Sequence, residues 1–583
     1  MPDKSLFSKA VVKIPKRSAF DKSFRNLLTT KCGTLTPILC DELIPNTTVN
    51  IKMALSATLP PLASETFMNV NLCVEAFFCP TRLVMLGFED FIQGKTDLKY
   101  GTSINSAVDA KLRVPIIRLN GSQSATTSYL GNGTLADYLG CRFSSLTGQV
   151  DINALPFYVY HEIYNSWYRN SMIQTPIYAE SFYPSNVNYL ISRIKFTKPN
   201  SSSGYVIALN NSYWDNVKIG ELRQRNFGSD YFTSAVPSPQ NGAAQKVSMF
   251  INTGNGSTEY PTLAADRIST EDPPLASGKD ATLEGLSFGF TDVNGANFTS
   301  APITQFTIAS LRAANSLQIW LERNNLCGNR FVDFVHGQYG ANLKDSIAQR
   351  PVYLGSAKFP VYSKGIYQTS ADSNSGNNPF DSVGSRYGHA YAEGTDFIVN
   401  HFTAQEPGYL MIIASLVPEV TYSSGLSRML TRYTAIDSYG DMANPILQNV
   451  GMQPIYDYEF DKYLNADDSF GVFGYVDRYA DWMTRHHELH GLLRDGGSLQ
   501  SFALQRGGTS DGISTQFLQI PTDYMDQVTA VDDAISSYGC WIDCYFDYKA
   551  VMPLARYSVP SLQDPAYEHG DSVVIDRGGR HID

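Results

Sequence analysis

The stretch VNIKMALSATL, residues 49–59, decides the fold class of this chain. Its apolar side chains recur at every second position, namely at Val49, Ile51, Met53 and Leu55. Polar Asn50 and Lys52 fall between them. Because successive side chains of a β-strand point to opposite faces, this period of two predicts a strand with one face in a core.

Further strands are expected on both sides of this stretch and again near the end of the chain. Thr34–Ile44 and Met68–Phe78 are rich in β-branched and apolar residues, and the pairs Pro45-Asn46 and Pro60-Pro61 separate the three stretches as turns. The same texture returns in Thr395–Phe402, Tyr409–Val420 and Cys540–Val551. A tight connection around Gln405–Gly408 joins the first two of these later strands. The chain is therefore expected to be mainly β.

Two helices are expected, at Pro156–Arg169 and Thr307–Asn325, because apolar side chains recur there at spacings of three and four. In the first these are Tyr160, Ile163, Tyr164 and Trp167, and in the second Ile308, Leu311, Ala314, Leu317 and Leu321. Thr307 is placed to cap the first turn of the second helix, and Gly328 is placed to end it.

Two long polar stretches interrupt the strand signals. Ser238–Ile303 is rich in Asn, Gly, Ser, Thr and Pro and holds three basic and seven acidic residues, and a second stretch spans about Leu98–Val150. The first is far longer than the loops of about 4–6 residues in compact domains, so we interpret it as an insertion. Strands early, strands late and long insertions between them favour a jelly roll, because its connections can lengthen without disturbing the pairing of distant strands.

The first 31 residues carry a charge opposite to that of the rest. Eight basic and two acidic residues give them +6, which leaves −17 for the remainder of a chain whose net charge is −11. A basic arm on an acidic body is typical of a tail that meets a polyanion, and a solvated, frayed terminus is the alternative. The candidate nucleic-acid-binding residues are Lys4, Lys9, Lys13, Lys16, Arg17, Lys22 and Arg25.

Nothing in the sequence predicts secretion, a membrane span or a cofactor. Lys9 and Lys13 interrupt the apolar stretch Phe7–Ile14, and the run Tyr409–Val417 is far shorter than the roughly 20 residues that cross a bilayer. Eight cysteines are spread along the chain, and their closest pairs, Cys73/Cys79 and Cys540/Cys544, are not CxxC half-sites. We expect a soluble intracellular product with reduced, mostly buried thiols.

Two glycine-containing motifs resemble enzyme motifs without the context that the chemistry needs. Gly94-Lys95-Thr96 matches the end of a phosphate-binding loop, but Glu89 stands where the leading glycine belongs. Gly508-Thr509-Ser510-Asp511-Gly512 matches a nucleophile elbow, which requires a strand before the serine and a helix after it. Ile513–Ile520 is instead expected to be a short strand that ends at Pro521, so we interpret the motif as a loop between strands.

A histidine group, His486, His487 and His490 with Glu488, resembles a zinc-binding helix. The metalloprotease motif places two histidines four residues apart with the glutamate directly after the first, whereas here Glu488 follows His487 and the next histidine is three residues on. His486 and His490 could share a helical face, but Glu488 would then point elsewhere. A polar surface or subunit-interface segment is favoured over a metal site, and no catalytic or metal-binding residue is predicted.

Short segments along nearly the whole chain occur in the order seen in a known family. They are Ile14–Ser23 (IPKRSAFDKS), Gly33–Ile38 (GTLTPI), Phe77–Leu83 (FFCPTRL), Arg223–Ser234 (RQRNFGSDYFTS), Leu311–Ala314 (LRAA), Gln349–Gly355 (QRPVYLG), Thr421–Leu426 (TYSSGL), Gly474–Ala480 (GYVDRYA) and Ala550–Pro560 (AVMPLARYSVP). This ordered set resembles the major capsid proteins of microviruses, in particular the gokushovirus branch. Ser238–Gly242 departs from the family's WPQKG by lacking the Trp and the Lys, and Met172–Glu221 is longer than usual in the family.

The resemblance implies an eight-stranded antiparallel jelly-roll barrel, with long insertions and a few helices, that forms a T=1 icosahedral shell around a circular single-stranded DNA phage genome. Residues 1–31 would be a basic arm and residues 32–583 the jelly-roll domain, with Ser238–Ile303 as a variable surface protrusion that meets the host. The implied partners are copies of the chain, packaged DNA, a minor spike or pilot protein, a small DNA-binding protein and a host surface receptor. The implied location is the virion, and the host bacterial cytoplasm during assembly.

The alternative from another class is a phage receptor-binding or glycan-cleaving β-sandwich protein, which would explain the aromatic residues and polar loops. Glycan cleavage requires a pair of carboxylates in a cleft, and the sequence singles out no such pair. Within the capsid interpretation the cations of the arm neutralise phosphates. Phe7, Phe20 and Phe24 either stack on unpaired bases or hold the arm under a neighbouring subunit.

Overall fold

The computed structural model describes most of the strand-rich part of the chain and only short pieces of the insertions. The described residues are 9–14, 17–85, 88, 92, 114, 116–120, 132–142, 149–177, 199–200, 204–208, 220–240, 251–252, 258–259, 290–291, 297–298, 308–327, 330–367, 386–433, 452–460, 471–506, 512–530, 534–554 and 571–576.

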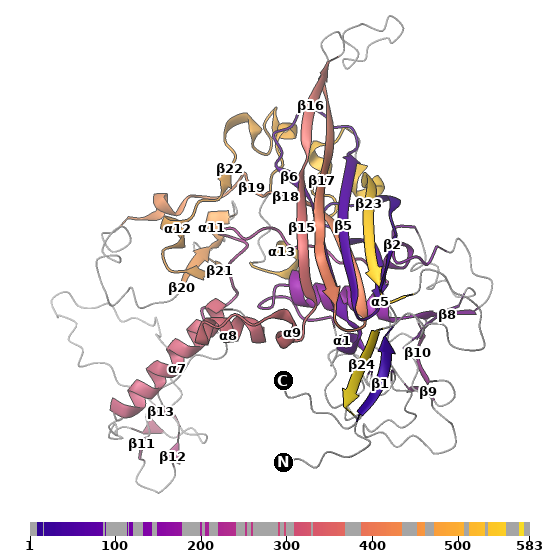
Figure 1. Ribbon diagram of the computed structural model, residues 1–583. Coiled ribbons are helices and arrows are strands. Elements are labelled where there is room, and N and C mark those ends of the chain that lie inside the picture. Colours follow the sequence, from indigo (N-terminus) through magenta and orange to yellow (C-terminus); the bar gives the residue numbers. More distant parts are fainter. Residues whose placement is uncertain are drawn as a thin grey trace, which may run out of the picture.

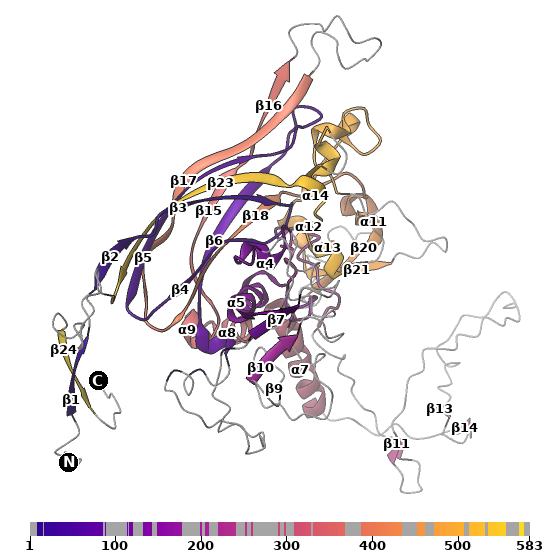
Figure 2. The same cartoon turned by 90° about the vertical axis from the view of Figure 1, so that its right-hand side faces the viewer.

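Eight strands form two facing antiparallel sheets (Figures 1 and 2). They are β3 (Phe24–Thr30), β4 (Thr36–Leu43), β5 (Thr47–Thr58), β6 (Val70–Pro80), β15 (Val352–Pro360), β17 (Arg386–Ala404), β18 (Gly408–Pro418) and β23 (Cys540–Met552). One sheet has the order β15-β6-β18-β4, and the other has the order β17-β5-β23-β3, extended by β16 (Tyr362–Tyr367) and β2 (Ser18–Asp21). Early and late strands thus alternate in both sheets, which is the jelly-roll arrangement. The predicted fold class is confirmed, although no ladder among the described strands joins the sheets into a closed barrel.

The strand predicted at residues 49–59 is confirmed as β5, and its alternation has the expected effect. Val49, Ile51 and Met53 are fully buried, whereas Lys52 and Ser56 point away from the core. β23 alternates in the same way, and the inward side chains of both sheets form one hydrophobic core. The other predicted strands are confirmed as β4, β6, β17 and β18, and only residues 405–407 separate β17 from β18.

The outer face of the β6–β18 sheet is covered by helices. β18 is buried along nearly its whole length because Leu410 and Ile412 face the inner core while Met411 and Ile413 face a second hydrophobic cluster. That cluster is built by α1 (Thr81–Val84), α4 (Leu135–Tyr138), α5 (Leu155–Ile163) and the π-helical turn η1 (Tyr164–Tyr168). The helix predicted at Pro156–Arg169 is therefore confirmed, with a π-helical end.

The second predicted helix is confirmed as α7 (Ile308–Cys327), which extends away from the sheets in Figure 1. Its predicted cap and end, Thr307 and Gly328, lie outside the described residues. The next helix, α8 (Phe331–Tyr339), ends at Gly340, whose φ of 67° is the left-handed conformation that closes a helix. Of the predicted insertions, residues 98–150 and 238–303, the structure describes only short pieces.

A surface lobe, residues 421–433, 452–460 and 471–506, packs beside the jelly roll. It contains β19 (Thr421–Tyr422), β20 (Met452–Tyr456), α11 (Asp457–Phe460), β21 (Val472–Asp477), α12 (Ala480–Met483) and β22 (His487–Glu488). Beneath it, the strand predicted at Ile513–Ile520 is wrong: Thr515–Leu518 is the helical turn α13. The physical reason is that the Ser514 side chain accepts a hydrogen bond from the backbone N–H of Phe517 and caps the turn, which buries Phe517 and Leu518.

The remaining elements are short. They are β1 (Lys9–Ile14) paired with β24 (Asp571–Asp576), β7 (Ile116–Asn120), β8 (Gln149–Asn153), β9 (Pro199–Asn200), β10 (Gly204–Ala208), β11 (Ile251–Asn252), β12 (Thr258–Glu259), β13 (Phe290–Thr291), β14 (Asn297–Phe298), α9 (Asp345–Ala348), η4 (Arg428–Thr431), η7 (Gly491–Leu493), η8 (Gln500–Phe502), η9 (Asp526–Val528) and α14 (Ala534–Tyr538).

Gly33, in the turn between β3 and β4, provides a test of this packing. Its φ is 66°, and an added Cβ would lie 2.5 Å from Cβ of Ile520 and 2.7 Å from its carbonyl oxygen. We expect Gly33→Ala to lower the free energy of unfolding by about 2–4 kcal/mol, through backbone strain plus overpacking, as measured by urea denaturation. Gly340→Ala is the matched control, because φ is 67° and nothing lies within 4 Å of the added Cβ. Equal losses in the two variants would contradict the close packing at Gly33.

Candidate nucleic-acid and assembly surfaces

The structure divides the seven candidate arm cations into three groups. Lys4 and Lys16 lie outside the described residues, and Lys9 and Lys13 belong to β1, which pairs with β24 near the other end of the chain. Arg17, Lys22 and Arg25 lie on or beside β2 and β3, which pair with β23. Residues 18–30 of the predicted arm are therefore part of the second sheet.

The three sheet-bound cations are engaged by the same subunit. Lys22 forms an ion pair with Asp41, whose carboxylate also accepts a hydrogen bond of 2.6 Å from the hydroxyl of Tyr548. Arg25 donates from Nε to Asp543 over 2.7 Å, and Arg17 donates to the hydroxyl of Thr48. The contact of Arg25 thus holds β3 against β23, whereas Lys22 reaches Asp41 of β4 and Arg17 reaches Thr48 of β5.

Of the three phenylalanines of the predicted arm, two lie in the described residues. The ring of Phe24 stacks on Phe546, with ring centroids 5.0 Å apart, so this side chain fastens the arm to its own subunit. Phe20 is half-buried on β2, and Phe7 lies outside the described residues.

The ion pairs of Asp21 and Asp543 lie where β2 and β3 pair with β23. They predict that this part of the second sheet loses structure in acid. The hydrogen bond from Lys549, followed by those from Ser23, holds the pKa of Asp21 well below its ordinary value of 3.8, and the bond from Arg25 lowers the pKa of Asp543. Since both folded-state values are depressed, the stabilisation is present above the ordinary pKa and is lost as the pH falls through the lowered one. We expect hydrogen-exchange protection of residues 18–30 to fall between about pH 5 and about pH 2 relative to β18. In the double variant Asp21→Asn, Asp543→Asn this protection should be low already at neutral pH, and an unchanged pH profile in that variant would contradict the assignment.

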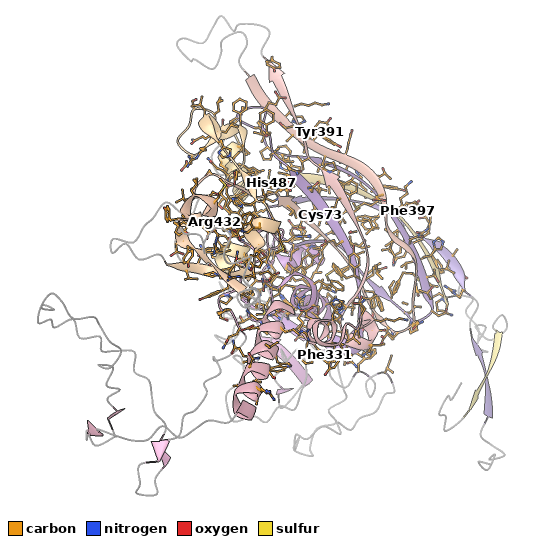
Figure 3. The ribbon with its side chains drawn as sticks, turned by 90° about the vertical axis from the view of Figure 1, so that its left-hand side faces the viewer. Cys73, Phe331, Tyr391, Phe397, Arg432 and His487 are labelled. Carbon is orange, nitrogen blue, oxygen red and sulfur yellow. The ribbon has the colours of Figure 1, made fainter. Side chains whose placement is uncertain are left out.

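The outer face of the second sheet is open, in contrast to the helix-covered face of the first (Figure 2). Large apolar side chains there are about half or more exposed: Leu27, Tyr362, Phe397, Trp541 and Tyr545. Figure 3 shows Tyr391 and Phe397 on this sheet. We call the outward side of β16, β17, β5, β23 and β3 the open face.

The segment Arg223–Ser234, one of those that carry the family resemblance, is bound to the first sheet through Arg225. Arg225 makes a two-pronged ion pair with Glu75 of β6, over 2.9 and 3.0 Å, and donates to Ser415 of β18 over 3.0 Å. Tyr168 of η1 donates to the same carboxylate. Burial opposes the charge of Arg225, but the attraction of Glu75 outweighs it and the pKa of the guanidinium is raised. This network therefore ties the segment and the helical cover to the first sheet.

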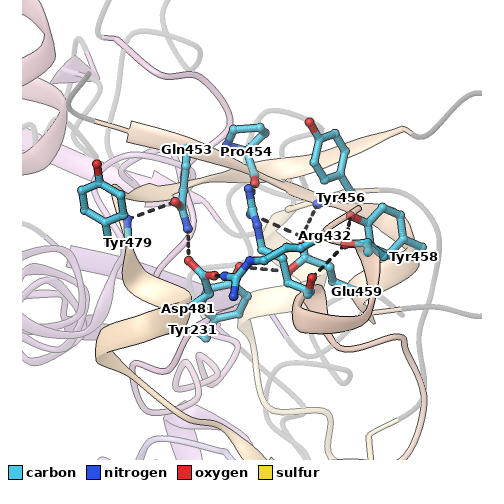
Figure 4. Close-up of polar contacts among 11 residues, drawn as sticks. Tyr231, Arg432, Gln453, Pro454, Tyr456, Tyr458, Glu459, Tyr479 and Asp481 are labelled. Carbon is cyan, nitrogen blue, oxygen red and sulfur yellow. Dashed lines mark hydrogen bonds and ion pairs between the residues drawn. The ribbon is translucent and has the colours of Figure 1, made fainter. Parts of the chain in front are cut away.

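A groove crosses the surface lobe. Figure 4 shows the polar contacts among residues beside it. Arg428 donates to the carbonyl oxygen of Pro454 over 2.6 Å, and Arg432 pairs with Asp481. The buried carboxylate of Glu459 accepts from the hydroxyl of Tyr231 over 2.9 Å, and its burial raises its pKa. Such a network fixes the loops of the lobe.

Apolar side chains are exposed around this groove and on α7. They are Leu426, Met429, Leu430, Trp482 and Met483 on the lobe, and Leu317, Ile319 and Trp320 on the helix. Aromatic residues and methionine are enriched in the cores of protein interfaces, so both areas are candidate contacts between subunits.

The histidine group lies on the lobe and is not helical. Nε2 atoms of His486 and His490 lie 3.4 and 3.3 Å from the two oxygens of Glu488, and His487 lies 3.2 Å from Glu419. Burial among aromatic rings lowers the pKa of His486. Figure 3 places His487 and Arg432 on this lobe.

The two glycine-containing motifs of the sequence lie largely outside the described residues. Gly94-Lys95-Thr96 and residues 508–511 are outside the described residues. Among the side chains that the structure describes, no three or more His, Cys, Asp or Glu residues are grouped to hold a metal ion. None of the described helices is both long and apolar enough to cross a membrane.

Comparison with known proteins decides the family. The model of a family described as capsid protein (F protein) matches residues 10–562. The chain belongs to this family. The capsid proteins of this family share its sequence pattern over nearly the whole length, and the microvirus resemblance predicted from the sequence is confirmed.

Individual capsid proteins are similar from end to end. Capsid protein VP1 of Chlamydia phage 1 is 28% identical, covering 96% of this chain and 98% of its own length. Capsid protein VP1 of Bdellovibrio phage phiMH2K is also 28% identical, with 94% and 95% covered, and that of Spiroplasma virus 4 is 23% identical, with 91% and 92% covered. As a member of a capsid protein family, the chain is a structural protein of the virion that assembles with copies of itself.

The aromatic residues of the open face were not predicted from the sequence as functional residues. The signal was present in Cys540–Val551, where Trp541 and Tyr545 occupy the polar positions of an alternating strand. Large aromatic residues at such positions leave apolar surface exposed on the outer side of the strand.

Proposed function

We propose that this protein is the major capsid protein of a T=1 icosahedral shell around a circular single-stranded DNA phage genome. The observation that carries the proposal is the jelly-roll order of eight strands in a chain that matches the capsid family from residue 10 to residue 562. A jelly roll resists edge-to-edge aggregation and lets its loops and covering helices make the contacts.

The proposal assigns different roles to different surfaces. The exposed apolar areas of α7 and the surface lobe contact neighbouring copies, and repetition of such contacts closes the shell. Ser238–Ile303 forms the variable protrusion that meets the host receptor, since a polar, acidic segment is easily solvated and tolerates change. A minor spike or pilot protein and a small DNA-binding protein complete the virion, which assembles in the bacterial cytoplasm.

Expression of the full chain, followed by sedimentation and electron microscopy, tests this function. Isometric particles or pentamers are the expected result. Discrete monomers or trimers that act on a polysaccharide would overturn it and favour the receptor-binding or glycan-cleaving alternative.

Within this function, Lys4, Lys9, Lys13 and Lys16 are proposed to bind DNA phosphates together with Arg17, Lys22 and Arg25, the last three being already engaged within the subunit. Replacing the four lysines with glutamine should weaken binding to single-stranded DNA and flatten its salt dependence, by about 0.7 log units per log unit of salt for each lost phosphate contact. Fluorescence anisotropy with labelled oligonucleotide measures both. Lys344→Gln, at an exposed lysine before α9, is the control. A salt slope equal to that of the wild type would show that the arm does not contact phosphate.

A further inference from the structure

The open face has the chemistry of a platform for unpaired bases. Trp541 and Tyr545 are 49% and 50% exposed and lie four residues apart on the outward side of β23, which separates them by about 13 Å. Phe397 of β17 is 53% exposed and lies opposite Lys52, whose Nζ is 5.4 Å from the ring centroid. Three aromatic rings therefore stand on one solvated sheet, two on β23 and one on β17, with β5 between these two strands.

The residues between these rings are small. Thr58 lies opposite Trp541 and Ala54 opposite Tyr545, with Ser56 between them on β5. One shallow hollow is bounded by Arg25, Ala54 and Tyr545. A second lies between Thr58 and Trp541 of the sheet and the segment Asn132–Arg142, which includes Asp137 and Arg142. Flat aromatic rings beside shallow hollows on a sheet are the arrangement with which proteins stack successive bases of single strands.

The charges of the open face determine how a strand would lie on it. Asp543 is paired with Arg25, and Asp547 lies 3.1 Å from Nζ of Lys549, while Glu393 borders the first hollow. These carboxylates repel phosphates that approach the sheet. A bound strand would therefore turn its bases toward the rings and its phosphates away from the sheet.

The start of β2 lies at the edge of this same sheet. β2 pairs with the end of β23 at Lys549–Met552, and Ser18 lies opposite Met552. The first sheet has no comparable exposed face because helices cover it.

We infer that the open face binds single-stranded DNA by stacking of bases on Trp541, Tyr545 and Phe397, and that it is the genome-facing surface of the shell. This rests on the proposed function, which supplies the single-stranded genome. Stacking on aromatic side chains is tolerant of sequence, as packaging of a whole genome requires.

The test uses the full-length chain and a fluorescein-labelled oligo(dT) in anisotropy titrations. Trp541→Ala and Tyr545→Ala should each weaken binding about tenfold, with an unchanged salt slope because stacking releases no counterions. Tyr339→Ala is the control, since Tyr339 is 75% exposed on α8, outside the open face and outside the areas proposed to contact neighbouring copies. Affinities of Trp541→Ala and Tyr545→Ala equal to that of Tyr339→Ala would overturn the inference.

A second measurement does not depend on the folding of a variant. Wild-type particles whose DNA carries 5-iodouracil are irradiated, and crosslinked peptides are identified by mass spectrometry. Crosslinks at Trp541 or Tyr545 are expected, and crosslinks confined to other peptides would overturn the inference.

Two further outcomes distinguish a failure of the DNA-binding inference from a failure of the proposed capsid function. If Trp541→Ala and Tyr545→Ala abolish particles while the oligo(dT) affinity is unchanged, the open face contacts protein and the inference is wrong. If the wild-type chain forms no particle and binds no oligo(dT), the proposed function itself has failed.

Discussion

Arg225→Ala should lower the free energy of unfolding by about 3–5 kcal/mol, because it leaves the carboxylate of Glu75 without its cation in a largely buried site. Only 21% of the Arg225 side chain and 15% of the Glu75 side chain are exposed. The loss also removes the hydrogen bond to Ser415 and the guanidinium that lies 5.4 Å from the ring centroid of Tyr168. A shift of the urea midpoint at unchanged slope measures the effect.

Glu75→Gln and Glu406→Gln form a matched pair for this prediction. Glu406 pairs with Arg82 on the surface, where 34% and 31% of the two side chains are exposed, so Glu406→Gln should cost less than about 1 kcal/mol. Glu75→Gln should cost several times more because it leaves Arg225 buried and uncompensated. Equal effects of the two substitutions would show that the buried network does not hold the Arg223–Ser234 segment.

Phe232→Ala should cost about 3–5 kcal/mol, since it removes a fully buried ring from the centre of an aromatic cluster. Phe232 is 1% exposed, and its ring centroid lies 4.8 Å from that of Tyr422 and 5.4 Å from that of Phe460. These two partners come from separate segments of the surface lobe, so the cavity would loosen the lobe as well as the core beneath it.

Hydrogen exchange and urea denaturation together measure this effect. The lobe segments 421–433 and 452–460 should lose protection before β5 and β18 do, because their shared packing partner is gone. Phe331→Ala is the control, since Phe331 is 66% exposed on α8 and its removal should change stability by less than about 0.5 kcal/mol. A loss of protection spread evenly over the sheets would contradict the role given to Phe232.

The sequence was sufficient for elements whose own pattern determines them. The period of two in residues 49–59 predicted β5, because one face of that strand meets the core and the other meets solvent. Spacings of three and four predicted α5 and α7 in the same way. The eight-stranded arrangement came from the family resemblance, since pairing of β3 with β23 joins residues at opposite ends of the chain and no local pattern encodes it.

Elements whose structure depends on contacts with distant parts of the chain were not predicted from the sequence. Phe24–Thr30 was assigned to a basic arm, yet its residues form β3 because β23 supplies a partner strand and Asp543 a partner for Arg25. Ile513–Ile520 has the composition of a strand, but the cap from Ser514 and the burial of Phe517 make it helical. The network of Glu75, Tyr168 and Arg225 joins three separate segments, so its members could not be recognised as partners from their positions in the chain.

Cryo-electron microscopy of purified, genome-containing particles tests the central claim most directly. We expect a T=1 icosahedral shell in which the sheet formed by β3, β23, β5 and β17 faces the DNA and the helix-covered sheet faces outward. A particle without icosahedral symmetry, or a shell whose inner surface is the helix-covered sheet, would contradict the account.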